Sequence, residues 1–214
     1  MTLSGAAANS APAKKPFGGM IPARVRPAAL TIGGFGALLV VIEVINFATR
    51  PWLVDTLGIR PRSAHGLIGI VTAPLLHAGW GHLFSNLVPF LIFGFLVLVG
   101  GAQQFVAVTT VVWLVSGFGV WLIAASNSVT VGASGVVFGW LAYLVSRGFF
   151  NRRVGQIAVG LILLAIWGGL FWGLFPGATG VSWQAHLFGA VGGVLAAMLV
   201  YRADSPAKKS VPQA

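Results

Sequence analysis

Residues 82–100 read HLFSNLVPFLIFGFLVLVG, an apolar run with polar side chains only near its start. Wound as an α-helix, a run of this length crosses a hydrocarbon core of roughly 30 Å. The chain has six such runs, at roughly 28–49, 82–100, 104–124, 133–146, 155–175 and 184–201. The sequence therefore predicts an all-α membrane protein, a bundle of six transmembrane helices with a long connection between the first two.

The composition of the whole chain also indicates a membrane protein. Of the 214 residues, 57% are hydrophobic and only 7% are charged, whereas soluble domains carry about 25% charged residues. The absence of cysteine excludes disulfides and cysteine-based metal or redox chemistry. The net charge of +10 does not indicate nucleic-acid binding, because the basic residues lie at the ends of apolar runs and form no patch interleaved with aromatics.

The distribution of basic residues predicts the orientation of the helices. With both termini in the cytoplasm, only three of the 13 Lys and Arg residues lie outside, all of them in the first connection. Cytoplasmic segments of membrane proteins carry such an excess of positive charge. We therefore expect both termini to be cytoplasmic, with a disordered basic tail at 1–27, the six-helix domain at 28–201 and a polar tail at 202–214.

Polar side chains stand near the starts of three of these runs. His82 and Asn86 are four residues apart and share one helical face of the second run, and His77 lies just before it. Ser134 opens the fourth run within the letters GASG, and His186 lies near the start of the sixth. All three runs begin on the outer side of the predicted topology. These residues are therefore expected at a similar depth in the bilayer, where ionisable groups mark functional sites.

Small residues predict how the serine and the histidine come together. Glycines spaced four apart follow each of them: Gly135 with Gly139, and Gly189 with Gly193. Helix backbones approach closely where small residues recur at this spacing in membrane helices. If the two glycine faces pack against each other, Ser134 and His186 meet.

This pairing predicts nucleophilic catalysis. Serine attacks once a base takes its proton, and His186 is the base within reach of Ser134. Because no carboxylate lies near either residue in the apolar runs, we expect a dyad rather than a triad. The oxyanion of the intermediate needs donors, and the Ser134 main-chain N–H, His82 and Asn86 lie at the right depth, with His77 as a further candidate. Neither a metal nor another cofactor is expected.

Other classes of membrane protein agree less well with the sequence. An intramembrane aspartyl protease needs two aspartates inside its helices, and the apolar runs contain none. A zinc protease needs a pattern such as His-Glu-x-x-His, which is absent. A transporter or channel explains polar residues at one depth but gives no reason for Gly-x-Ser-Gly.

These motifs together resemble those of the rhomboid family of intramembrane serine proteases, and the likeness covers the whole six-run core. The family's second-helix pattern, a His followed by His five residues later and Asn four residues after that, stands here as His77, His82 and Asn86. Its Gly-x-Ser-Gly begins at Gly132, and its sixth-helix histidine followed by spaced glycines stands as His186.

The resemblance implies Ser134 as nucleophile, His186 as general base, and His82 and Asn86 as oxyanion donors. It implies a first loop lying partly in the outer leaflet and a fifth helix that acts with its following loop as a gate. The partners would be lipid and single-span transmembrane substrates, cut near the outer face of a bacterial plasma membrane. The alternative is an inactive relative that binds client helices, although such relatives usually lack the serine or the histidine.

Two features depart from the family pattern. Many members have a tyrosine four residues after the serine, whose ring packs on the catalytic histidine. Phe138 stands here, which keeps the ring and lacks the hydroxyl. The adjacent Trp-Arg pair of the first loop is missing, and residues of similar type near it are Trp52, Trp80, Arg60 and Arg62.

Overall fold

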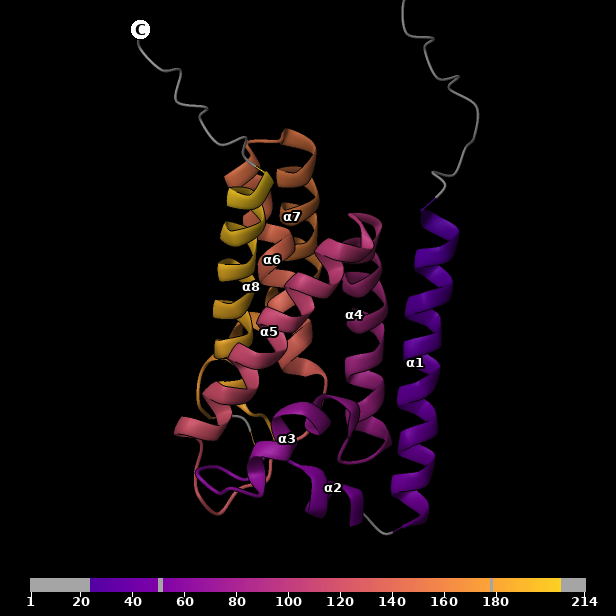
Figure 1. Ribbon diagram of the computed structural model, residues 1–214, viewed down its shortest axis with the longest axis vertical. Coiled ribbons are helices and arrows are strands. Elements are labelled where there is room, and N and C mark those ends of the chain that lie inside the picture. Colours follow the sequence, from indigo (N-terminus) through magenta and orange to yellow (C-terminus); the bar gives the residue numbers. More distant parts are fainter. Residues whose placement is uncertain (1–23, 50–51, 178, 205–214) are drawn as a thin grey trace, which may run out of the picture.

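The computed structural model describes residues 24–49, 52–177 and 179–204, and its regular secondary structure over these ranges is helical (Figure 1). Most of both expected tails lies outside the described residues. The elements in chain order are α1 (Val25–Ala48), α2 (Trp52–Leu57), α3 (Gly66–Thr72), η1 (Ala73–Leu75), α4 (Trp80–Val99), α5 (Ala102–Ile123), α6 (Ser134–Asn151), α7 (Val154–Trp167), η2 (Gly168–Leu174) and α8 (Trp183–Asp204). The prediction of an all-α membrane bundle is confirmed.

Six long helical segments correspond to the six apolar runs, but α6 differs from the others. Within the described part of the chain, five segments are long and apolar enough to cross a membrane: α1, α4, α5, the α7–η2 stretch and α8. α6 carries Arg147 and Asn151 and ends beyond the run predicted at 133–146. It packs against α4, α5, α7 and α8, so its faces meet protein rather than lipid. This central position explains why α6 is less apolar than a lipid-facing span.

α6 and α8 touch backbone to backbone. A Cβ atom added at Gly189 would lie 2.1 Å from the main-chain oxygen of Gly135, and one added at Gly193 would lie 2.1 Å from that of Gly139. Any side chain larger than hydrogen at these positions would push the two helices apart. The starts of the two helices are therefore held together at one end of the bundle.

The connection between α1 and α4 lies at the end of the bundle opposite the described chain ends (Figure 1). Two indoles of α5 hold it: Trp113 Nε1 donates to the carbonyl of Ile70 at 2.8 Å, and Trp121 Nε1 donates to that of Ser63 at 2.9 Å. Arg62 of the loop donates in turn to a main-chain carbonyl at the end of α5. The loop is thus fixed against α5 without an adjacent Trp-Arg pair.

The close contact of α6 and α8 predicts that one added methyl group between them lowers the stability of the protein. Gly189→Ala and Gly193→Ala should each lower the melting temperature in detergent, because overpacking costs about 1–3 kcal/mol. Gly33→Ala in α1 is the matched control, since a Cβ added there meets nothing within 4 Å. Equal melting temperatures for all three variants would show that the two helices are not in backbone contact.

Candidate active site

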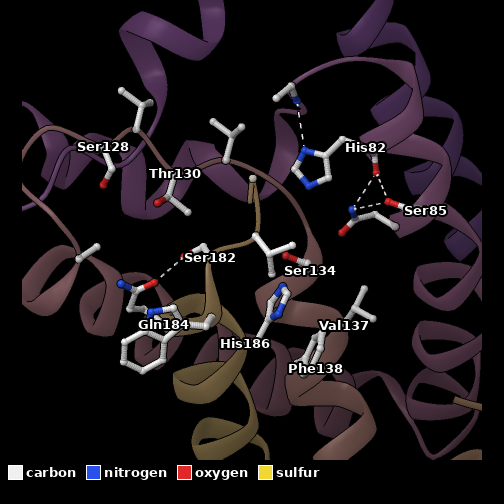
Figure 2. Close-up of a pocket in the computed structure, with 18 of the residues that line it drawn as sticks. His82, Ser85, Ser128, Thr130, Ser134, Val137, Phe138, Ser182, Gln184 and His186 are labelled. Carbon is white, nitrogen blue, oxygen red and sulfur yellow. Dashed lines mark hydrogen bonds between the residues drawn. The ribbon is translucent and has the colours of Figure 1, made fainter. Parts of the chain in front are cut away.

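A pocket of about 570 Å³ is lined by the starts of α4, α6 and α8 together with the loops that precede α6 and α8. Four of the predicted site residues line it along with Phe138: His82, Asn86, Ser134 and His186. Figure 2 shows His82, Ser134 and His186 pointing into the pocket from separate segments of the chain. Asn86 also lines the pocket. The structure thus brings together residues that are up to 104 positions apart (82 to 186).

Ser134 is the first residue of α6 and is positioned by the turn before it. The chain enters the helix through Gly132, whose φ of +118° favours glycine. The main-chain N–H of Gly132 donates to the carbonyl of Ala73 at 2.9 Å, and an isolated β-bridge joins Ile59 to Thr130. The first N–H groups of a helix have no helical partner, so Ser134 stands where main-chain donors are available.

His186 lies in the first turn of α8 and is only 8% exposed. Its ring stacks on that of Phe138, with centroids 3.9 Å apart and planes 7° from parallel. Its Nδ1 lies 2.9 Å from the main-chain oxygen of Gly173. Because a carbonyl oxygen only accepts, this contact assigns the proton of the neutral ring to Nδ1 and leaves a lone pair on Nε2. Figure 2 shows Ser134 beside this imidazole.

Ser134 and His186 line the same pocket, and among the described residues no hydrogen bond joins their side chains. Contacts between reacting groups are often loose in ligand-free structures and shorten when substrate binds. None of the described residues that line the pocket carries a carboxylate. The arrangement therefore offers a hydroxyl next to an imidazole base, with no acidic side chain as a third member.

His82 and Asn86 face the pocket from α4. The main-chain N–H of Ala78 donates to His82 Nδ1 at 3.3 Å, so a neutral His82 carries its proton on Nε2. A Cβ added at Gly132 would lie 2.7 Å from that Nε2, which places the donor next to the turn preceding Ser134. The Asn86 amide donates to the carbonyl of His82 at 2.8 Å and, in a longer contact of 3.5 Å, to Oγ of Ser85.

His77 lies behind His82 rather than in the pocket wall. It is 0% exposed, and its ring stands edge-on to that of His82 at 5.3 Å between centroids. Its carbonyl accepts a hydrogen bond from the Asn46 amide of α1 at 3.0 Å, and that amide also donates to buried Glu43 at 3.4 Å. Burial, with His82 as the second cause, lowers the pKa of His77 to about 3, so its ring is neutral at pH 7.

The structure adds two residues to those that the sequence singles out. The Oγ of Ser182 accepts a hydrogen bond from the main-chain N–H of Ala185 at 3.3 Å and so supports the start of α8, one turn before the histidine. A serine just before an apolar run is a typical helix-capping signal in a sequence. Gly173 contributes only its main-chain carbonyl to His186. Every residue has such a carbonyl, so the sequence alone could not single out this contact.

Known proteins are similar in sequence to this chain. The Rhomboid domain model matches residues 64–203. An uncharacterized protein of Mycobacterium tuberculosis is 43% identical over 188 residues, which are 84% of this chain and 77% of that protein. Rhomboid-like protein 11, chloroplastic, of Arabidopsis thaliana is 34% identical over 152 residues, 63% of this chain and 53% of its own.

A protein of Bacillus subtilis, YdcA, which is provisionally named a rhomboid protease, is 30% identical over 132 residues, 61% of this chain and 65% of its own. The family match covers the first loop from residue 64 and every helix that lines the pocket. The chain belongs to the rhomboid family and is a multi-pass membrane protein.

Proposed function

We propose that the protein is an intramembrane serine endopeptidase that cleaves transmembrane segments of other membrane proteins. The observation that carries this proposal is that Ser134 and His186, from different helices, line one pocket while Nε2 of His186 keeps a lone pair. Membership of the rhomboid family supports it, because members are generally intramembrane serine proteases. The alternative, an inactive relative that binds client helices, gives no reason for the serine and the histidine to face the same pocket.

In the proposed reaction, Ser134 Oγ attacks the scissile carbonyl carbon while His186 Nε2 takes the hydroxyl proton. The resulting oxyanion lies beside the His82 Nε2–H and the Ser134 main-chain N–H, with the Asn86 amide as a third donor. His186 then gives its proton to the leaving nitrogen, the C–N bond breaks and an acyl-enzyme remains. Water deprotonated by the same imidazole hydrolyses the ester and restores the serine.

The position of the pocket supports the substrate class. Its lining includes the starts of α4, α6 and α8, and these helix starts lie near the first loop, at the end of the bundle opposite the described chain ends (Figure 1). With both termini in the cytoplasm, as the distribution of basic residues predicts, the pocket opens toward the outer face of the membrane. A single-span protein with small residues at the cut, whose helix unwinds easily there, fits such a site.

The most direct test is labelling of the purified protein with a fluorophosphonate probe, followed by mapping of the modified residue. We expect Ser134 to be labelled and Ser134→Ala to be unlabelled, because the probe reacts with a serine whose proton a base removes. A folded wild-type protein that does not react at Ser134 would favour the client-binding alternative.

Substitutions should separate the base from the oxyanion donors. Ser134→Ala and His186→Ala should each abolish cleavage of a transmembrane substrate in liposomes, and the double variant should be no worse, because the two act as a unit. Asn86→Ala should have the mildest effect, lowering the cleavage rate by no more than about 10²–10³-fold, because other oxyanion donors remain. His82→Ala should fall between these effects.

Thermal melts of the four single variants serve as the control for folding. None of the four substitutions should unfold the protein, because each removes a polar group rather than burying a new one. Full activity of a folded His186→Ala variant would rule out the Ser-His dyad.

The depth of the site predicts a preference for membrane substrates. Casein, a soluble unfolded protein, should be cut far less efficiently than a transmembrane substrate with an Ala or Gly at the cut, because a soluble chain does not partition into the bilayer. The measurement is kcat/KM for both substrates in the same liposomes. Equal values would contradict a site below the membrane surface.

A further inference from the structure

The acidic residues of the chain leave the base without a carboxylate partner. The sequence has three of them, Glu43, Asp55 and Asp204. Glu43 lies in α1 beside Asn46, and Asp55 lies in α2. Asp204 ends α8, 18 residues after His186 and hence about 27 Å along the helix. In serine proteases a third group holds the histidine in the correct tautomer, so here that group has to be something other than an acid.

We propose that the main-chain carbonyl of Gly173 is this group: it orients His186 and selects its tautomer. This positioning role rests on the peptidase function proposed above. The Gly173 oxygen lies 2.9 Å from Nδ1, and Phe138 covers the face of the ring at 3.9 Å between centroids. Stacking on Phe138 fixes the plane of the ring, and the carbonyl fixes its rotation within that plane. Nε2 is then the nitrogen left to take the Ser134 proton.

The local sequence explains why this carbonyl is available. Gly173 lies in the last turn of η2, a 3₁₀ helix in which each carbonyl pairs with the N–H three residues later. Three residues after Gly173 stands Pro176, which has no N–H. The preceding carbonyl, that of Trp172, is engaged by the N–H of Phe175 at 3.3 Å. The Gly173 carbonyl is therefore left without a 3₁₀ partner and can accept from the imidazole.

The glycine is needed for the same contact. A Cβ added at position 173 would lie 2.9 Å from His186 Nδ1 and 3.1 Å from Cζ of Phe138. A Cβ added at Gly169, in the same helix, would meet nothing within 4 Å. Close approach of the backbone to the imidazole thus requires glycine at 173 and not at 169.

The first test compares Gly173→Ala with Gly169→Ala as the matched control. The methyl group at 173 has to displace either the ring or the carbonyl, whereas the methyl group at 169 has open space. On a transmembrane substrate, kcat should fall about tenfold or more for Gly173→Ala with little change in KM, and should stay within about twofold for the control.

The second test reads the tautomer directly and does not depend on cleavage. In micelles, protein labelled with nitrogen-15 in its histidine side chains reports by N–H coupling which ring nitrogen carries the proton, and His186→Gln identifies the signals. The wild type and Gly169→Ala should carry the proton on Nδ1 of His186. Gly173→Ala should show a mixture that includes the Nε2–H form. A wild-type proton on Nε2 would overturn the proposal.

A third variant covers the case in which Gly173→Ala does not fold. Replacing Leu174 by its α-hydroxy acid turns the Gly173 carbonyl into an ester carbonyl, a weaker acceptor, without adding atoms. The same replacement at Leu170 is the control. Weakening of this hydrogen bond should lower kcat by up to about fivefold at 174 only.

The outcomes separate this proposal from the peptidase function. Wild-type kcat and an unchanged tautomer in the 174 ester variant would overturn the positioning role and leave the peptidase intact. Absence of cleavage by a wild-type protein with its proton on Nδ1 would overturn the peptidase function and still support the bond between carbonyl and imidazole.

Discussion

The backbone contact between α6 and α8 is the constraint on which the rest of the structure depends. Ser134 and His186 each lie within three residues of it, so their relative position follows from the packing of two helices and needs no contact between the side chains themselves. Ser116 of α5 extends the contact to a third helix, because its Oγ donates to the carbonyl of Ala185 at 2.9 Å and occupies the space beside Gly135. Interiors packed this closely are rigid, which suits a site that two separate helices must assemble.

The opposite wall of the pocket depends on α1. The amide of Asn46 links Glu43 to the main chain of His77, and the ring of His77 stands against that of His82. A line of buried polar groups therefore runs from the first helix to a predicted oxyanion donor. On the proposed mechanism, a change in the packing of α1 would reach the donor side of the site without touching the serine or its base.

Much of this arrangement could be predicted from the residue types. Apolar runs located the long helices, and glycine spacing indicated that the starts of α6 and α8 meet. The apolar run at 133–146 located α6 but ended five residues short of Asn151, because this helix, packed against α4, α5, α7 and α8, continues past its apolar stretch. The place of His77 behind His82 depends on how α1 packs, which no local pattern encodes. The bond to Gly173 uses the main chain, which is the same at every residue, and only Pro176 three positions later hints that its carbonyl lacks a partner.

The absence of a carboxylate among the residues lining the described pocket has a consequence for the membrane. At the proposed position below the membrane surface, a triad with an aspartate would keep a permanent ion, and a single charge at the centre of a membrane helix costs about 2.5–3.5 kcal/mol to insert. A carbonyl is a dipole with no net charge, so a neutral serine, imidazole and carbonyl leave the resting site uncharged. On the proposed mechanism, opposite charges arise only while the tetrahedral intermediate lasts, as an adjacent imidazolium and oxyanion whose fields largely cancel in the surrounding lipid.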